Sequence, residues 1–369
     1  MPELPIEIDP LDMSCTEQEL VLRCFRDRDY LITPEGFIFT VIGNIHPPDR
    51  VIAYLKYVPD ERGKWRLGHS RYRRALEHYN VPSVLDSMQF LREKAPQYVF
   101  ESTVDRISLP AVPTDRIAEH LCPETRLLEL RSGQNRDELE SKALRLTELI
   151  SEKAGVPQDS LGPTGSILAR IHDPTFSDID LVVYGYDNAL RVKAAVKTLM
   201  GSPSGAIRRL AGASREKWIA ERLKSTPLAR RSVVTLLARK WNIGTFEETG
   251  FSVHPVHTEI EMRQHYGDEL YTPLGIVDAT ARIASGNESL FMPAIYQVES
   301  MNLKGSHAVS TVDRIVSYES LYADVAAEGE TVSCRGKLER ISSSSGVHHR
   351  ILVGSPEAQG TDYLFPLAH

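Results

Sequence analysis

The stretch LGPTGSILARIHDPTFSDIDLVVYG, residues 161–185, decides how the middle of this chain folds. It contains the pair Gly165-Ser166 and, further on, the aspartates Asp178 and Asp180 at the start of an apolar run. The run 179–184 is rich in β-branched and aromatic residues, which predicts a strand. Because side chains at positions i and i+2 of a strand lie on one face, we expect Asp178 and Asp180 to point the same way.

This pairing of aspartates with a Gly-Ser pair has a specific chemistry. Two neighbouring carboxylates repel each other unless a cation lies between them, and such oxygen ligands suit Mg²⁺, which then binds substrate phosphates. Gly165 permits close backbone approach, and amides at a helix start favour an anionic phosphate, to which Ser166 adds a hydroxyl donor. The alternative is structural: Asp178 caps a loop and Asp180 lies on a solvated strand edge.

A Gly-Ser pair, a short spacer and then Asp-hydrophobic-Asp resembles the signature of the DNA polymerase β-like nucleotidyltransferase superfamily. The chain also looks similar, more loosely and through both flanking regions, to the uncharacterised predicted nucleotidyltransferases of archaea. The superfamily resemblance implies a mixed sheet with helices, a nucleoside triphosphate bound with Mg²⁺ (two ions, with Mn²⁺ as an alternative), and nucleotidyl transfer to a hydroxyl. Carried over by position, Gly165 and Ser166 would hold triphosphate oxygens, and Asp178 and Asp180 would be the catalytic metal ligands.

The superfamily usually adds a third carboxylate on a neighbouring strand. The expected neighbour, Phe251 to Val256, has no acid, but Glu259 and Glu261 follow it at the i, i+2 spacing of one strand face and are candidates for the catalytic set. Alternatively, both are surface acids, and catalysis is slow, substrate-assisted or absent. Arg170, in the spacer, is a candidate for nucleotide contact, with a solvated loop position as the alternative.

Two basic segments are candidates for binding an acceptor. The predicted helical region after the aspartates is rich in Lys and Arg, and arginine at helical spacing can hold phosphate bidentately. Its candidate acceptor-binding residues are Arg208, Arg209, Arg215, Lys217, Arg230 and Arg231. Between residues 62 and 74, basic residues alternate with Trp65 and Tyr72, which suits phosphate contact with base stacking. In both cases the alternative is a solvated surface, packed through Trp65 in the second segment.

Periodicity outside the motif predicts an α+β (α/β) fold. An N-terminal α+β domain is expected over 1–130, with strands at 36–45 and 51–58 paired as a hairpin, a helix at 84–93, extended or irregular chain at 108–113 and a short helix up to His120. The nucleotidyltransferase core is expected over 131–243, with helices at 136–154, 188–200, 213–224 and 227–241. A β-rich domain is expected over 244–369, with strands at 250–256, 275–283, 330–341 and 350–353, and a small barrel is one form it could take. Its first strand is a candidate to complete the core.

The bulk properties limit the remaining classes. The 369 residues carry a net charge of −7, with 41% hydrophobic and 25% charged residues, which argues against a uniformly basic nucleic-acid binder and leaves room for local patches. The cysteines form no CxxC pair, which disfavours a zinc site and a disulfide framework. No apolar stretch approaches about 18 residues, so no membrane span is predicted and a cytoplasmic location is expected.

Together these patterns predict Mg²⁺-dependent transfer of a nucleoside monophosphate from a triphosphate to an acceptor hydroxyl, with release of pyrophosphate. The expected acceptor is RNA or another nucleic acid. Two alternatives stay open: nucleotidylylation of a protein or small molecule, and a nucleotide- or nucleic-acid-binding module that has lost turnover. The sequence indicates no oligomeric state.

Overall fold

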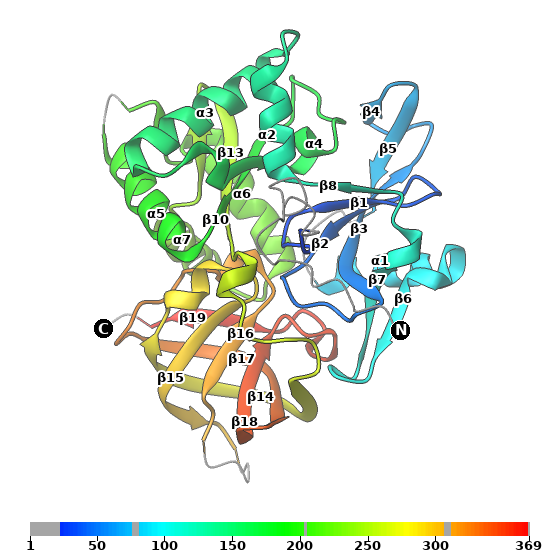
Figure 1. The fold of residues 1–369 in the computed structure, drawn as a ribbon. Coiled ribbons are helices and arrows are strands. Elements are labelled where there is room, and N and C mark those ends of the chain that lie inside the picture. The colour runs from blue at the N-terminus through cyan, green and yellow to red at the C-terminus, as the bar shows by residue number, and fades with distance from the viewer. Residues whose placement is uncertain (1–22, 76–80, 203–204, 306–310, 368–369) are drawn as a thin grey trace, which may run out of the picture.

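Three β-sheets with helices packed on them make up the computed structural model, which describes residues 23–75, 81–202, 205–305 and 311–367. In Figure 1 the first sheet lies at the right, the second at the upper left among most of the helices, and the third below both. The predicted mixture of helices and sheets is therefore confirmed at the level of fold class.

The first sheet is built mainly from residues before 122 and has eight strands. Its elements are β1 (Tyr30–Ile32), β2 (Ile38–Val41), β3 (Arg50–Pro59), β4 (Trp65–Leu67), β5 (Ser70–Arg74), α1 (Val81–Lys94), β6 (Val99–Ser102), β7 (Ile107–Pro113) and β8 (Glu119–Leu121). The expected hairpin is confirmed, because β2 and β3 pair antiparallel. Leu31, Phe39 and Leu55 are fully buried in the cluster to which Leu91 of α1 also belongs.

One expectation in this region is confirmed and one is wrong. Residues 108–113, expected to be extended or irregular because of their prolines, are extended and form most of β7, whose first half pairs with β6 and whose second half pairs with β3. Within the described residues, each half of β7 therefore has one paired edge and one unpaired edge. The missing N–H of a proline causes no loss of a hydrogen bond between strands where it faces the unpaired edge. The short helix expected up to His120 is only the 3₁₀ turn Thr114–Arg116, and His120 itself lies in β8, which pairs with β1.

The half-buried ring of His46 makes the stability of this sheet depend on pH. Its Nδ1 accepts a hydrogen bond from Ile52 N at 3.3 Å, and its Nε2 lies 3.2 Å from the carbonyl of Phe25, an arrangement that suits the neutral ring. Burial lowers the pKa of His46 to about 4. Since the unfolded chain takes up this proton first, the stabilisation is complete above about pH 6.5 and is lost as the pH falls towards 4.

We expect the wild-type chain to lose about 2 kcal/mol more unfolding free energy than His46→Gln when the pH is lowered from 7 to 5. Glutamine keeps one donor and one acceptor at this position but does not titrate. Urea unfolding of both proteins at the two pH values measures the difference. Parallel losses in the two proteins would show that His46 is not buried in its neutral form.

The second sheet surrounds the aspartate motif. Its five strands run in the order β11-β12-β13-β10-β9. The elements are α2 (Pro123–Ser132), α3 (Glu138–Ala154), β9 (Leu161–Thr164), α4 (Gly165–Leu168), β10 (Ile179–Tyr184), α5 (Tyr186–Gly201), β11 (Ile207–Arg208), α6 (Gly212–Ser225), α7 (Arg230–Arg239), β12 (Ile243–Phe246) and β13 (Thr249–Val256). Strand β10 is an interior strand, antiparallel to the edge strand β9 and parallel to the central strand β13.

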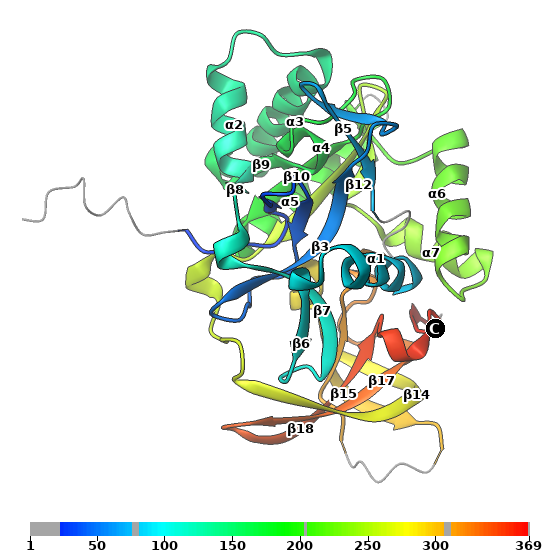
Figure 2. The same cartoon turned by 90° about the vertical axis from the view of Figure 1, so that its right-hand side faces the viewer.

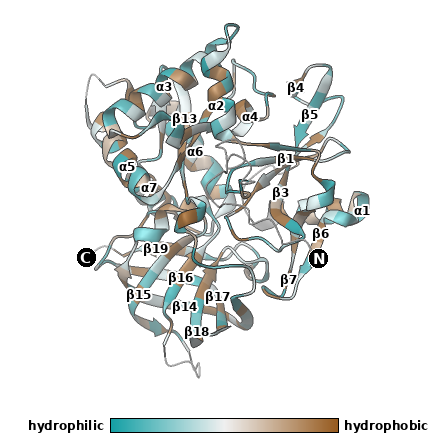
Figure 3. Ribbon diagram, in the orientation of Figure 1, coloured by the Kyte–Doolittle hydropathy of each residue, from teal (hydrophilic) through white to brown (hydrophobic). Residues whose placement is uncertain are grey.

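The helices predicted for this region form close to their expected limits. Helix α3 begins with a capping box between Asp137 and Glu140 and ends at Gly155, which is left-handed at φ 62°. Helices α5, α6 and α7 match the three segments expected between 188 and 241. In Figure 3 the surface helices carry hydrophilic as well as hydrophobic residues, as amphipathic helices do. Figure 2 shows α6 and α7 close together beside the third sheet, and Leu236 of α7 is part of that sheet's core.

The third sheet is a closed barrel. Its strands are β14 (Glu269–Ser285), β15 (Ala294–Leu303), β16 (Arg314–Ser317), β17 (Thr331–Ser343), β18 (Gly346–Val353) and β19 (Tyr363–Pro366). They follow the order β14-β15-β16-β18-β17, and β17 pairs back onto β14, while β19 extends from β17. The strands expected near 275–283, 330–341 and 350–353 are confirmed in the barrel. The strand expected at 250–256 is confirmed as β13, which belongs to the second sheet. Within the described ranges, no helix is both long and apolar enough to cross a membrane.

Candidate functional site

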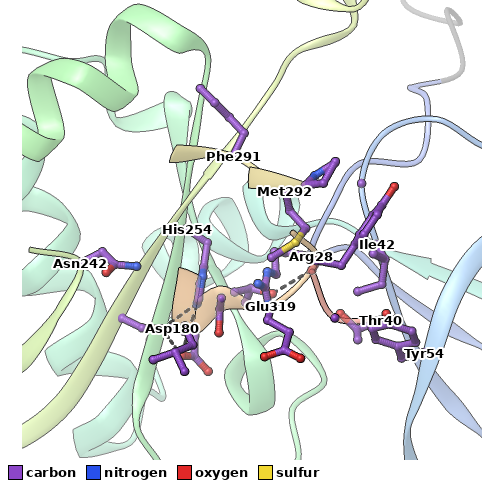
Figure 4. A pocket seen from close by; sticks show the side chains of 18 of the residues that line it. Arg28, Thr40, Ile42, Tyr54, Asp180, Asn242, His254, Phe291, Met292 and Glu319 are labelled. Carbon is purple, nitrogen blue, oxygen red and sulfur yellow. Dashed lines mark hydrogen bonds and ion pairs between the residues drawn. The ribbon is translucent and has the colours of Figure 1, made fainter. Parts of the chain in front are cut away.

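A cavity of about 1060 Å³ lies where the three sheets meet. Its lining includes Lys56 from the first sheet, Asp178 and Asp180 from the second, and Glu319 from the segment that follows β16 of the barrel. Figure 4 shows Asp180 and Glu319 directed into this space. The motif that stood out in the sequence therefore faces a cavity to which all three sheets contribute.

Glycines bring the backbone close to both aspartates. A Cβ added to Gly165, at φ +66°, would lie 2.3 Å from Oδ2 of Asp180. A Cβ added to Gly250, at the start of β13, would lie 2.5 Å from Oδ1 of Asp178. Ser166, the next residue in α4, is buried and also lines the cavity. The backbone turn at Gly165-Ser166 and the two aspartates thus form one compact site.

Asp180 is held as a carboxylate by its neighbours. The hydroxyl of Ser252, on β13, donates to Oδ1 of Asp180 and lies 2.7 Å from Nε2 of His254, which is itself 3.9 Å from the same carboxylate oxygen. Burial alone would raise the pKa of Asp180, but His254, the positive charge of Lys56 and the Ser252 hydroxyl together hold it below its usual range. Asp180 is therefore ionised at neutral pH.

Asp178 has the opposite tendency. Its surface is open to the cavity, yet the surrounding protein and the charge of Asp180 raise its pKa above the ordinary aspartate value. Lys217 and Arg74 partly oppose this rise, and Glu221, on the same helix as Lys217, adds to it. The pair of aspartates thus carries an excess of negative charge that a bound cation would relieve.

The first sheet supplies positive charge that the sequence reasoning missed. Lys56, on β3, is buried and lies close enough to Asp180 to lower its pKa, with its Nζ 5.1 Å from the centre of the Tyr30 ring. Arg28 acts in the same way on His254. The alternation of residues along β3 places Tyr54 and Lys56 on one face, but nothing in the sequence indicates that this face meets β10.

The neighbouring strand carries no third acid next to the aspartates. In the parallel register Asp180 pairs with Ser252, and Val182 pairs with His254. With Gly250, these are the β13 positions on the side of the two aspartates. An acidic group does approach from another direction, since Glu221 of α6 lines the cavity and raises the pKa of Asp178.

Glu259 and Glu261 do not lie beside the aspartates, contrary to expectation. They belong to a 3₁₀ turn, Glu259–Glu261, rather than to a strand. Oε2 of Glu259 is 2.5 Å from an Arg26 nitrogen, and Oε1 of Glu261 accepts from Tyr186 N at 2.7 Å. Tyr186 follows the opposite end of β10 from Asp180, about 20 Å along the chain direction at the usual rise per strand residue. Both carboxylates are therefore engaged by Arg26 and Tyr186 N, away from the aspartate pair.

Most of the other expected contact residues also point elsewhere. Arg170 pairs with Glu129 of α2 at 2.6 Å. Arg209 donates to the carbonyl of Lys240 at 3.1 Å, and Arg215 and Arg230 both pair with Glu216. The expected acceptor-binding residues that are not part of the cavity lining are Arg208, Arg209, Arg215, Arg230 and Arg231. Lys217 alone of that set of six lines the cavity.

Part of the basic and aromatic segment 62–74 does reach the cavity. The Trp65 ring packs edge-on against Tyr57 and Phe176, with centroid distances of 5.5 and 6.0 Å. The guanidinium of Arg74 lies 4.9 Å from the centre of the Trp65 ring. Trp65, Arg74 and Phe176 all line the cavity, so this segment both packs through Trp65 and presents a cation near Asp178.

Gly165→Ala is expected to destabilise the chain by more than Gly155→Ala does. Both glycines have a positive φ, which costs another residue roughly 1–3 kcal/mol. Only the Gly165 change also places a methyl group against Asp180, because a Cβ on Gly155 meets nothing within 4 Å. Thermal unfolding of both variants measures the difference. Equal losses would contradict the close approach of Gly165 to Asp180.

Two further groups of acidic and histidine side chains could hold a metal ion. Asp29, His120 and Cys122 form one group, and Asp137, Glu140 and His172 form the other. Each already has an internal explanation: Asp29 is paired with Arg23, and Asp137 and Glu140 make the capping box of α3.

Comparison with known proteins relates the chain to an archaeal protein. It is 29% identical over 346 residues to a protein of Methanocaldococcus jannaschii described as uncharacterized, covering 92% of this chain and 98% of that protein. No family model matches the chain, and no solved structure matches it. Since the unmatched part of the chain is shorter than any of the three sheet regions, the similarity reaches into all of them.

Proposed function

We propose that this chain is a metal-dependent nucleotidyltransferase of the polymerase β-like type, which transfers a nucleoside monophosphate from a triphosphate to an acceptor hydroxyl. The observation that carries the proposal is the apposition of Gly165 to Asp180 in a cavity that also holds Asp178. The excess negative charge of the two aspartates fits one or two divalent cations, with Mg²⁺ the expected ion. When bound, such ions would neutralise phosphate charge and align the attacking and leaving oxygens.

The chain's own residues have separable roles in this proposal. Asp178 and Asp180 would hold the cations, and backbone amides after Gly165, with the hydroxyl of Ser166, would contact phosphate oxygens. Lys56 and Lys217 line the same cavity and would offset the remaining phosphate charge. The cavity volume, about 1060 Å³, lies at the upper end of the range for small-ligand sites and suits a nucleotide together with part of an acceptor.

The acceptor we favour remains RNA or another nucleic acid, and a protein or small molecule remains the enzymatic alternative. A nucleotide-binding module without turnover is a second candidate function, and one observation favours it. The β13 positions beside the aspartates are Gly250, Ser252 and His254, so this strand supplies no third carboxylate. Glu221 is the acid available to complete a catalytic set in place of Glu259 or Glu261.

The test is incorporation of label from α-labelled nucleoside triphosphates, with Mg²⁺ or Mn²⁺, into RNA, DNA, protein and small-molecule fractions. Pyrophosphate release is measured in parallel, and Asp178→Asn/Asp180→Asn is the matched variant. Label in one fraction, lost in the variant, would support transfer and name the acceptor class. Triphosphate binding without label or pyrophosphate would favour the binding module.

A further inference from the structure

The face of the first sheet that carries Lys56 continues into a second group of polar side chains. Tyr54 lies two residues before Lys56 on β3, so both side chains share the face that looks into the cavity. Thr40 of β2 is the direct cross-strand partner of Tyr54. Burial raises the pKa of the Tyr54 phenol, and Glu319, which follows β16 of the barrel, lies close enough to add to this rise. Figure 4 shows Glu319 between Asp180 on one side and Thr40 and Tyr54 on the other.

These three polar groups have no hydrogen-bond partner within the described residues. The side-chain oxygen of Thr40 is buried and unpaired, and the residue is only 2% exposed. The phenol of Tyr54 and the carboxyl of Glu319 likewise make no hydrogen bond to any residue that the structure describes. Thr40 is buried, whereas Tyr54 and Glu319 are half-buried and line the cavity. Because buried polar groups in native proteins are nearly always paired, the unpaired Thr40 hydroxyl beside these two groups indicates a ligand that pairs with it.

The groups are also uncharged. Burial, and then the nearby carboxylate of Asp362, raise the pKa of Glu319 to about 8, against the opposing charge of Arg222. At neutral pH Glu319 is therefore mainly a protonated carboxyl that can donate as well as accept. Its stem is fixed by close packing, since a Cβ on Gly354 would lie 3.1 Å from Cγ of Glu319. Two hydroxyls and a neutral carboxyl favour a neutral ligand group over a phosphate.

We propose that Thr40, Tyr54 and Glu319 form a subsite for the uncharged, planar heterocycle of a nucleoside. The inference rests on the proposed function for its nucleotide chemistry, but the site itself is separate from the aspartates. Ile42 and Met292 add apolar walls to the same part of the cavity, as a planar ring requires, and the aromatic ring of Tyr54 offers a stacking surface. The heterocycle belongs either to the triphosphate or to the acceptor.

Binding of free nucleosides tests the subsite directly, because they carry no phosphate and need no metal. Calorimetric titration with adenosine, guanosine, cytidine and uridine is expected to show binding of at least one by the wild-type chain. Glu319→Ala and Thr40→Val should each weaken that binding at least about tenfold, because each leaves a ligand group unpaired. Glu319→Gln, whose amide resembles the protonated carboxyl, should change it by less than about threefold.

The control is Glu328→Ala, an exposed residue outside this cavity, with the unfolding temperature of each variant measured alongside. Failure of all four nucleosides to bind, or equal binding by wild type and both disruptive variants, would overturn the subsite. Competition between the bound nucleoside and saturating triphosphate with Mg²⁺ would assign the heterocycle to the triphosphate, and simultaneous binding would assign it to the acceptor.

The outcome stays separable from that of the proposed function. Asp178→Asn/Asp180→Asn should retain nucleoside binding, because the three subsite residues are unchanged. Nucleoside binding with no label transfer would remove the proposed function and leave the subsite in place. Label transfer with no effect of Glu319→Ala or Thr40→Val on nucleoside binding would support the proposed function and remove the subsite.

Discussion

Asp178→Asn/Asp180→Asn is expected to weaken Mg²⁺-dependent binding of a nucleoside triphosphate at least about 100-fold, because each lost charged contact is worth about 1.5–3 kcal/mol. Nucleotidyl transfer should fall further, by about a thousandfold or more, because the charge that develops in the transition state loses its stabilisation. Asparagine keeps the shape of both side chains, so the close packing at Gly165 is preserved. Calorimetric titration of the triphosphate with and without Mg²⁺ measures the binding effect.

The matched control is Asp187→Asn, at an exposed position in the first turn of α5. This variant should bind triphosphate and transfer label as the wild type does. Unfolding temperatures distinguish loss of the site from loss of the fold, and we expect no decrease for Asp178→Asn alone, since it removes repulsion from Asp180. Unchanged Mg²⁺-dependent binding in the double variant would contradict the assignment of these aspartates.

Glu339→Ala should destabilise the chain by about 3–5 kcal/mol, the usual cost of leaving a buried charge without its partner. Arg350 loses its ion pair in this variant, while Lys337 keeps Glu357. Glu339, on β17, is 1% exposed and lies between two buried cations. Its oxygens are 2.9 Å from Lys337 Nζ and 2.7 Å from Arg350 Nε. Arg350 also lies over the Tyr271 ring, at 3.5 Å from its centre. Chemical denaturation measures the loss.

Two comparisons make this prediction specific to the ion pairs. The triple variant Lys337→Met/Glu339→Ala/Arg350→Met should recover a large part of the lost stability, because no uncompensated charge remains. Glu328→Ala, at an exposed position, should change the unfolding free energy by less than about 0.5 kcal/mol. A Glu339→Ala loss as small as that of Glu328→Ala would show that water reaches Lys337 and Arg350.

Local patterns were enough to predict the elements around the aspartate motif. The residue types of the run 179–184 predicted β10, and helical periodicity predicted α3 almost to its ends. The shared direction of Asp178 and Asp180 follows from strand geometry alone. The prolines at 108–113 left extended and irregular chain as alternatives, and the segment is extended because β3 and β6 pair with it. Pairing partners distant in sequence are not visible in a local pattern.

The composition of the site depended on contacts between distant segments. Glu259 and Glu261 have the spacing of one strand face, but the chain turns there, and Arg26 and Tyr186 N take up their charges. Conversely, Lys56 and Glu319 come from the first sheet and the barrel, and no motif links either of them to Asp180. Sequence reasoning thus located the aspartates and could not list what the other two sheets bring to them.

The most direct test of the account is a crystal structure of the chain with Mn²⁺ and a triphosphate analogue that resists cleavage between its α- and β-phosphates. We predict anomalous density for Mn²⁺ at about 2.1–2.2 Å from carboxylate oxygens of both Asp178 and Asp180, as for hard octahedral ions, with phosphate oxygens at the amides after Gly165. Triphosphate bound elsewhere in the cavity, or Mn²⁺ bound away from both aspartates, would contradict the account.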